Sequence, residues 1–241
     1  MQVIFALQQS LRRRFWATLG ALALFWALLA PAQAANLEPI TSVYKATLEK
    51  GVPFNGKATR SLKPRPDGTW EYRFLVESMV ADIDEILILR WENDRVVPLS
   101  YDYQLRGWAV KNRHIRHTFD WTRQQVTAEV KDRKSTLDIP PGTLDKLGFQ
   151  LQLMQDLKAG KQRMEYTIVD KDRLREYVFE VLRKEKLDTE QGQVETVVVE
   201  RVRAPEKKRE THMWFVPDWN HLLVRLVQIE EDGTRYEIHM D

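Results

Sequence analysis

The chain has 241 residues, of which 30% are charged and 10% aromatic, a profile that fits one sizeable globular domain and excludes a disordered chain. Its formal net charge is +2, but three of its 37 basic residues, at positions 12–14, fall in a segment that we expect to be removed. The remaining 34 basic residues then face 35 acidic ones, so the mature charge of about −1 excludes the strongly basic field of a nucleic-acid-binding protein.

Residues 1–34 have the pattern of a secretory signal peptide. Arginines at 12–14 supply the positive region, an uncharged apolar run spans 15–30, and small residues follow up to Ala34. The run is shorter than the roughly 20 residues that a spanning helix prefers, which weighs against an uncleaved membrane anchor. We therefore expect cleavage after Ala34 or Ala35, export to the periplasm and no membrane span in the mature chain. The chain has no cysteine, so it has neither a disulfide nor a lipid-bearing cysteine.

The first half of the mature chain is predicted to form strands joined by short turns. In residues 70–76, aromatic and apolar residues alternate with charged ones, which is typical of a strand with one buried face. Pro98 predicts an edge or a bulge near the start of its strand, because proline cannot donate a ladder hydrogen bond. The predicted strands are 42–48, 56–62, 70–76, 86–91, 96–105, 114–121 and 125–131.

Residues 143–160 form the one convincing helix of the predicted mature chain. Thr143 can cap its first turn with a hydroxyl, and Gly160 can end it in the left-handed conformation. Apolar side chains recur at helical spacing and form a stripe that must be buried, and the sheet is the only partner available. The stripe consists of Leu144, Leu147, Leu151 and Met154, widened by Leu153 and Leu157.

Further strands are predicted after the helix, and together they define the fold. Asp232-Gly233 between the last two strands indicates a tight hairpin, and short turns throughout favour antiparallel pairing. So many strands would curl a sheet. We predict a mainly β fold in a single domain, residues 35–241: a curled antiparallel sheet or open β-barrel with one central amphipathic helix at about 143–160. A closed barrel and a two-sheet sandwich are the alternatives. These strands are 164–169, 176–182, 194–202, 212–216, 222–229 and 234–240.

Three short motifs carry a family resemblance. They are Thr143-Leu144-Asp145-Lys146-Leu147 at the start of the helix, Lys158-Ala159-Gly160 at its end, and Met213-Trp214-Phe215-Val216-Pro217-Asp218 before the last hairpin. On these motifs, residues 43–240 resemble a bacterial exported family known as domain of unknown function 3108. The resemblance implies a periplasmic β-rich domain without an established activity. The architecture is also similar to that of lipoprotein carriers, which hold acyl chains between a curved sheet and helices, but this is an analogy of fold alone.

The sequence contains few candidates for catalysis or metal binding. His114 and His117 are three apart, which on a strand places them on opposite faces, so they are poor joint metal ligands. Asp82, Asp84 and Glu85 form an acidic cluster before an apolar strand, which we interpret as solvated loop charge. No G-x-S-x-G elbow or glycine-rich phosphate loop is present. We expect no catalytic residue, no metal and no cofactor; a hydrolase that uses His117 or Asp84 is the least favoured hypothesis.

The tryptophans of the mature chain admit two interpretations. They can form the core and the rim of the barrel, or some of them can line an apolar cavity. The tryptophans are Trp70, Trp91, Trp108, Trp121, Trp214 and Trp219. The predicted cavity lining comprises Trp70, Tyr72, Phe74, Ile88, Tyr103, Phe119, Leu147, Leu151 and Met154.

A cavity of this kind in a curled sheet suits an acyl chain or another hydrophobic ligand. The favoured function is therefore a non-catalytic periplasmic binding or chaperone-like module for a lipid or other hydrophobic ligand in the cell envelope. The alternative is a structural or protein-interaction component of the envelope, with a fully packed helix and no ligand cavity. Whether the helix fills the hollow of the sheet or covers it as a lid decides between the two.

Overall fold

The computed structural model describes residues 37–49, 54–108, 110–190, 192–204 and 206–240. The predicted signal peptide and both predicted cleavage positions lie outside these residues. Across the part of the chain that is described, no helix has the length and apolar character needed to cross a bilayer. The elements are β1 (Ile40–Glu49), β2 (Phe54–Pro64), β3 (Trp70–Ser78), β4 (Asp82–Glu92), β5 (Arg95–Arg106), β6 (Arg113–Asp120), β7 (Gln125–Val130), β8 (Arg133–Asp138), α2 (Gly148–Lys158), β9 (Arg163–Asp170), β10 (Arg173–Thr189), β11 (Gly192–Val202), β12 (Glu210–Val216), the 3-10 turn η1 (Pro217–Trp219), β13 (Leu222–Ile229) and β14 (Arg235–His239).

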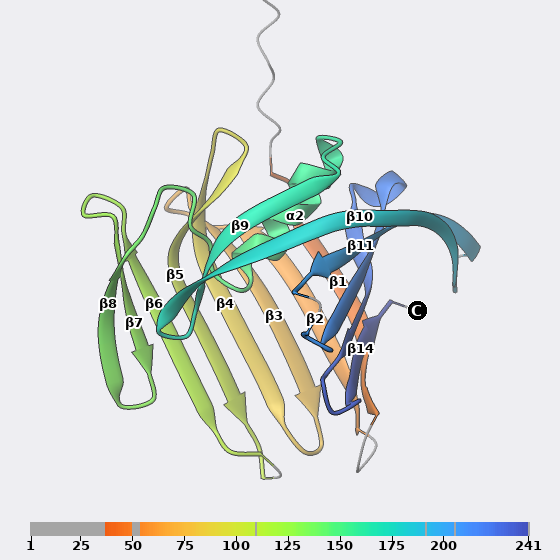
Figure 1. Ribbon diagram of the computed structural model, residues 1–241, viewed down its shortest axis with the longest axis horizontal. Helices are drawn as coiled ribbons and strands as arrows, with labels where there is room; N and C mark the ends of the chain where they lie inside the picture. The colour runs from red at the N-terminus through yellow and green to blue at the C-terminus, as the bar shows by residue number, and fades with distance from the viewer. Residues whose placement is uncertain (1–36, 50–53, 109, 191, 205, 241) are drawn as a thin grey trace, which may run out of the picture. The chain divides into compact units, whose positions relative to one another are not determined.

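The fourteen strands form one antiparallel sheet in the order β8-β7-β6-β5-β4-β3-β2-β1-β14-β13-β12-β11-β10-β9. Neighbours in the sheet are neighbours in the chain except at β1 and β14, whose pairing joins the two halves. The sheet curls around α2 (Figure 1), but among the described strands β8 and β9 remain its two edges and do not pair. The predicted curled, open sheet is confirmed, and the closed barrel and the two-sheet sandwich are excluded.

The sequence predicted every strand except β8. Arg133–Asp138 was missed because its residues are mostly polar and its exposed face gives no clear alternation. The irregularity expected at Pro98 is confirmed, since the register of β4 and β5 shifts where Ile88 faces Ser100 and Leu89 faces Pro98. The predicted hairpin at Asp232-Gly233 is also present, and Gly233 has a φ of 82°, which glycine adopts without steric cost.

The helix begins later than the sequence predicts. Thr143 does not cap it, because its hydroxyl donates instead to the carbonyl of Pro140 at 2.7 Å. The carboxylate of Asp145 satisfies the free N–H groups at the start of α2: its Oδ1 accepts from Leu147 at 2.8 Å and from Gly148 at 2.9 Å. The predicted cap at Thr143 is therefore wrong, and a neighbouring acidic residue supplies the hydrogen bonds.

Leu144 belongs to the sheet and not to the helix. Its N–H donates to the carbonyl of Thr167 at 2.9 Å, and its carbonyl accepts from Val169 at 2.8 Å, so it covers part of the edge of β9. At the other end, the prediction for Gly160 is confirmed. Its φ is 81°, and the N–H groups of Gly160 and Lys161 bond back to the last turn of α2.

The apolar stripe of α2 faces the sheet. Leu147 and Leu151 are 0% exposed and Met154 is 2% exposed, in one core cluster with residues of β3, β4, β5, β9 and β12. Figure 1 shows α2 between β9 and β10 on one side and the first strands of the sheet on the other. The helix thus lies inside the curve of the sheet, as predicted.

Candidate functional site

The predicted cavity lining is mostly packed core. The apolar side chains of α2 pack in one cluster with those of the surrounding strands, so the helix fills this region. Tyr72, Leu147, Leu151 and Met154 are buried in the main core cluster, and Trp70, Phe74 and Tyr103 are partly buried and pack against it.

The placements expected for Ile88 and Phe119 are wrong. Ile88 lies opposite Glu71 on β3, whereas its neighbours Leu87 and Leu89 enter the core, so Ile88 is on the other face of the sheet. The apolar run of β4 has no alternation from which its inner face could be read. Phe119 belongs to a separate cluster near the edges of the sheet, together with Val126, Ile139 and Val169.

A buried polar network ties α2 to the strands on both sides. Gln152, which is 1% exposed, accepts a hydrogen bond from the N–H of Val96 on β5 at 2.8 Å and donates to Asp156 at 3.2 Å. Asp156 in turn accepts from Tyr166 on β9 and from Lys161, both at 2.8 Å. Burial raises the pKa of Tyr166, so its hydroxyl stays protonated and continues to donate. The network is satisfied internally and serves to position the helix.

A buried cation lies inside the curve of the sheet. Arg60 on β2 is 2% exposed, and its guanidinium donates to the hydroxyl of Tyr72 at 2.6 Å and to Gln150 of α2 at 2.8 Å. It also stands 4.9 Å from the ring centroid of Phe74. Burial opposes its charge, but the facing phenols, Tyr72 first, hold the pKa of Arg60 above its usual value. Arg60 therefore remains a cation that is paired with oxygens and aromatic faces.

Two carboxyl groups lie near the start of α2. Asp145 is 0% exposed, and its Oδ2 has no hydrogen-bond partner among the described residues. Burial raises the pKa of Asp145 to about 7, with a further contribution from Glu85. Burial also raises the pKa of Glu85, whose carboxylate accepts from Tyr101 at 3.0 Å. Both carboxyl groups are therefore protonated more easily than an ordinary aspartate or glutamate.

The acidic cluster expected in a loop is instead divided between the two faces of β4. Asp84 lies on the outer face, where its two oxygens accept from Arg73 at 2.8 Å each. Glu85 lies on the inner face with Tyr101, and Asp82 is exposed at the start of the strand. The interpretation as solvated loop charge is wrong, because these residues belong to a strand whose alternation separates them.

His117 is a buried residue of the sheet. It is 1% exposed, its Nε2 lies 2.7 Å from the carbonyl of Lys171, and its ring stacks on Tyr101 with centroids 5.3 Å apart. Burial lowers its pKa to about 4, so the neutral ring donates from Nε2. His114 is exposed on the opposite face, 2.9 Å from Asp102, as the strand spacing predicts. Within the described residues, no three His, Asp or Glu side chains are grouped so that they could hold a metal ion.

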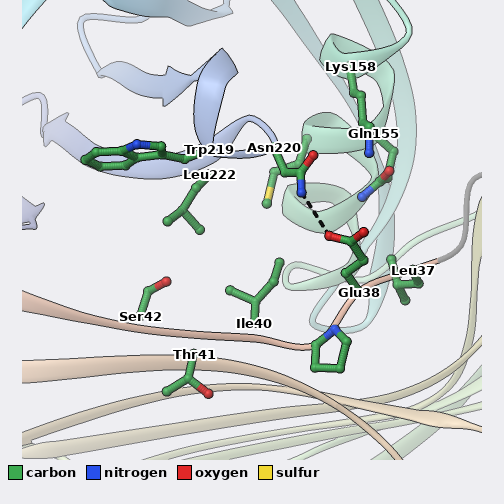
Figure 2. Close-up of a pocket in the computed structure, with 12 residues that line it drawn as sticks. Leu37, Glu38, Ile40, Thr41, Ser42, Gln155, Lys158, Trp219, Asn220 and Leu222 are labelled. Atoms are coloured by element: carbon green, nitrogen blue, oxygen red, sulfur yellow. Dashed lines mark hydrogen bonds between the residues drawn. The ribbon is translucent and has the colours of Figure 1, made fainter. Parts of the chain in front are cut away.

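The best-defined cavity lies where the start of β1, the last turn of α2 and η1 meet. It has a volume of about 270 Å³ and is shown in Figure 2. Gln155 and Lys158 reach it from the helix, and Glu38 closes one side by accepting a hydrogen bond from Asn220 at 2.9 Å. We call this cavity the β1–α2 pocket. Its lining residues are Leu37, Glu38, Pro39, Ile40, Thr41, Ser42, Met154, Gln155, Lys158, Trp219, Asn220 and Leu222.

Asn220, which lines the β1–α2 pocket, and the residue that follows it share an uncommon backbone conformation. Asn220 and His221 have φ values of 55° and 56°, in the left-handed region that residues other than glycine seldom adopt. Such conformations persist only where the surrounding structure imposes them, and they cluster at binding sites. Burial, with a contribution from nearby Lys158, lowers the pKa of His221, so Lys158 is the cation at this wall.

Met154 is the one residue shared by the β1–α2 pocket and the predicted cavity lining. The pocket was missed because its walls come from three segments far apart in the chain, none of which has a recognisable motif.

Among the tryptophans, Trp70, Trp91, Trp121 and Trp219 are partly buried, and Trp214 is 6% exposed. Trp108 differs from them, because 82% of it is exposed.

Two comparisons with known proteins match this chain. The family model described as protein of unknown function (DUF3108) matches residues 58–241. A crystal structure of a beta-barrel-like protein of domain of unknown function DUF1849 from Brucella abortus is similar, with a TM-score of 0.56 and 14% sequence identity, over 85% of this chain and 97% of that chain. At this identity the likeness shows a shared fold alone. No curated protein matches the chain in sequence. Neither match bears on the likeness to lipoprotein carriers, which stays an analogy.

Proposed function

The chain belongs to the DUF3108 family of proteins of unknown function, and we propose that it is a non-catalytic binding module for a lipid or another hydrophobic ligand of the cell envelope. The observation that carries this proposal is the β1–α2 pocket. Six of its twelve lining residues are apolar and six are polar, so it suits a small ligand that has both an apolar and a polar part.

The size and chemistry of the pocket define the ligand class. Its 270 Å³ corresponds to about nine water molecules in the liquid, enough for the end of an acyl chain or a small apolar molecule but not for a whole membrane lipid. Ile40, Met154 and Leu222 supply apolar contact, and Lys158 supplies a cation at the margin. A ligand with a short apolar part and an anionic or polar head therefore fits best.

Filling the pocket tests the proposal. Gln155→Trp places an indole in the cavity, and we expect the affinity of the full-length protein for a fluorescent fatty-acid probe to fall by about tenfold or more. Gln162→Trp is the matched control, because it makes the same exchange at an exposed position outside the pocket. The control also keeps residues 15–30, so it accounts for probe bound by that apolar run.

Native mass spectrometry of the protein purified from cells adds a second measurement. A mass increment that is present in the unaltered protein and in Gln162→Trp but absent in Gln155→Trp supports the proposal. Absence of both a retained ligand and probe uptake in the unaltered protein contradicts it, as does equal uptake by the two variants.

The alternative is a structural or protein-interaction component of the envelope. The complete burial of Leu147 and Leu151 favours it, because a fully packed helix leaves no room for a ligand under the stripe. Crosslinking in intact cells should then trap one specific envelope protein. Loss of that crosslink on Gln155→Trp would assign the contact to the pocket region, whereas its survival would place it on another surface.

We also propose that the chain is exported to the periplasm with residues 1–34 removed, which the arginines at 12–14 and the small residues before Ala34 support. Intact-mass measurement of the protein from a periplasmic extract tests this. A mass that begins at Ala35 or Asn36 agrees with the proposal, and a full-length mass in the membrane fraction contradicts it.

A further inference from the structure

Two turns at one end of the sheet carry the most exposed large apolar side chains of the described residues. Met79, between β3 and β4, is 92% exposed, and Trp108, between β5 and β6, is 82% exposed; Val110 is 36% exposed beside them. Figure 1 shows both turns at the end of the sheet away from α2. Large apolar side chains grouped in water are typical of an interaction surface.

The two turns are held together as a unit. The indole Nε1 of Trp108 donates to the carbonyl of Met79 at 2.9 Å. At Gly107, a Cβ would lie 2.3 Å from the carbonyl oxygen of Val80 and 2.6 Å from Cα of Ala81, so only glycine permits this approach of the two backbones. We call residues 79–81, 106–108 and 110–113 the tip. Because its turns are in contact, Met79 and Trp108 project from it together.

The tip is positively charged. Arg106, Lys111 and Arg113 are all exposed, and they belong to the tip itself. Two acidic residues border it, each opposite a basic one. Asp82 accepts a hydrogen bond from the N–H of Ser78 and lies opposite Arg106 in the ladder, and exposed Glu77 lies opposite Lys57. The surface around the exposed indole and thioether is therefore cationic.

We propose that the tip docks on the surface of an anionic lipid bilayer, with Trp108 and Met79 in the interfacial layer and Arg106, Lys111 and Arg113 against the headgroups. Tryptophan favours the headgroup level of a bilayer, and each basic residue near an anionic surface adds attraction. Met79 and Trp108 are 92% and 82% exposed, whereas the hot spot of a protein interface usually lies in a well-packed pocket. A bilayer is therefore the favoured partner.

This proposal does not depend on the β1–α2 pocket. The two sites lie at opposite ends of the sheet. The pocket is at the end where Ile40 pairs with Leu62, and the tip is at the end where Gly56 pairs with Ser78. Each site can be altered without touching the other.

Site-specific fluorescence tests the proposal. Since the chain has no cysteine, Met79→Cys can be labelled uniquely with an environment-sensitive dye in the full-length protein. With vesicles of phosphatidylcholine and phosphatidylglycerol, we expect a blue shift and quenching by lipid-attached quenchers. The matched control is Pro66→Cys in the exposed turn between β2 and β3, at the opposite end of the sheet, and its dye should not respond.

Two variants of the labelled protein identify the groups responsible. Trp108→Ala should weaken vesicle binding reported at position 79 by about tenfold. The double variant Lys111→Gln with Arg113→Gln should weaken this vesicle binding by about thirtyfold. Phosphatidylcholine vesicles or high salt should weaken the binding of the labelled protein without these two changes to the same extent. Both variants change exposed side chains, so the fold is expected to survive.

Three outcomes overturn the proposal. One is a dye at position 79 that does not respond to either kind of vesicle. Another is an equal response at positions 66 and 79, which would assign binding to another part of the chain. The third is a photo-crosslinker at position 79 that captures one protein in cells while vesicles give no response, which would make the tip a protein-docking site.

Discussion

Ionisable side chains are buried inside the curled sheet, where the sequence predicted an apolar interior. Arg60, Asp145 and His117 are each at most 2% exposed, and each has a hydrogen-bond partner. Burying such groups is costly unless their hydrogen bonds are satisfied or their protonation state changes. The stability of the protein is therefore expected to depend on pH through identifiable residues.

Asp145 should destabilise the fold as pH rises. Its pKa is raised by burial from 3.8 to about 7, so between these values the native state holds a proton that the unfolded state has lost. The free energy of unfolding should fall across this window, by about 4 kcal/mol at most. Urea denaturation of Asp145→Asn at several pH values should show a shallower decline than the unaltered protein.

The exposed carboxylate of Asp132 provides the control for that experiment. Asp132→Asn should keep the decline of the unaltered protein. If Asp145→Asn and the unaltered protein have parallel pH profiles, Asp145 is ionised in the native state and the assignment is wrong.

His117 should act in the opposite direction. Burial lowers its pKa from 6.5 to about 4, so between these values the unfolded state binds a proton that the native state does not. Its stabilising contribution is complete above pH 6.5 and is lost as pH falls toward 4, by about 2–3 kcal/mol in all. His117→Gln, whose amide can donate to Lys171, should lack this loss in acid denaturation, whereas exposed His114→Gln should retain it. An NMR titration that places the His117 midpoint near 6.5 would contradict the prediction.

At this scale the sequence identified the inner faces of strands with clear alternation. Tyr72 was placed on the inner face because the charged residues Glu71 and Arg73 stand on either side of it. Ile88 was misplaced because β4 is apolar on both faces in its central part. Buried Arg60 could not be foreseen, because a lone arginine in a strand is usually solvated.

The helix α2 is held by its polar face as well as by its apolar stripe. Gln152 caps the N–H of Val96 at the start of β5, and Asp156 receives the hydroxyl of Tyr166 from β9. These contacts fix the position of α2 along and around its axis, which leucine packing alone does not. The pocket at its last turn depends on that position.

Gln152→Ala should therefore lower the free energy of unfolding by more than the loss of the side chain's packing alone would. It leaves the N–H of Val96 buried without an acceptor, which costs about 1–3 kcal/mol of unfolding free energy. Gln155→Ala is the control, because it makes the same exchange three residues further along α2. It should change the free energy of unfolding by no more than about 0.5 kcal/mol. Equal effects in chemical denaturation would show that the network does not stabilise the helix.

The whole sheet is a single layer, and among the described strands β8 and β9 are its two edges and do not pair with each other. The edges differ, because Leu144 bonds to Thr167 and Val169 on β9. The N–H of Val169 therefore has a hydrogen-bond acceptor although Val169 lies on an edge strand. Curling also brings the turn after β9 close to β6, where His117 meets the carbonyl of Lys171.

Native-state hydrogen exchange should separate these edges. Amides of β8 are expected to exchange faster than those of β6, which is paired on both sides, and the amide of Val169 should be protected by the carbonyl of Leu144 at 2.8 Å. NMR-detected exchange at low temperature provides the measurement. Protection of β8 equal to that of β6 would mean that another surface covers this edge in solution.

The antiparallel pairing of the strands and the presence of one buried helix could be read from the sequence. Alternation, turn residues and helical spacing are local patterns, and short turns leave neighbouring strands few ways to pair. The β1–α2 pocket and the exposed tip at Trp108 could not be read in this way. Each of them arises where residues far apart in the chain meet, and the partners of a side chain are settled only when the sheet has curled around the helix.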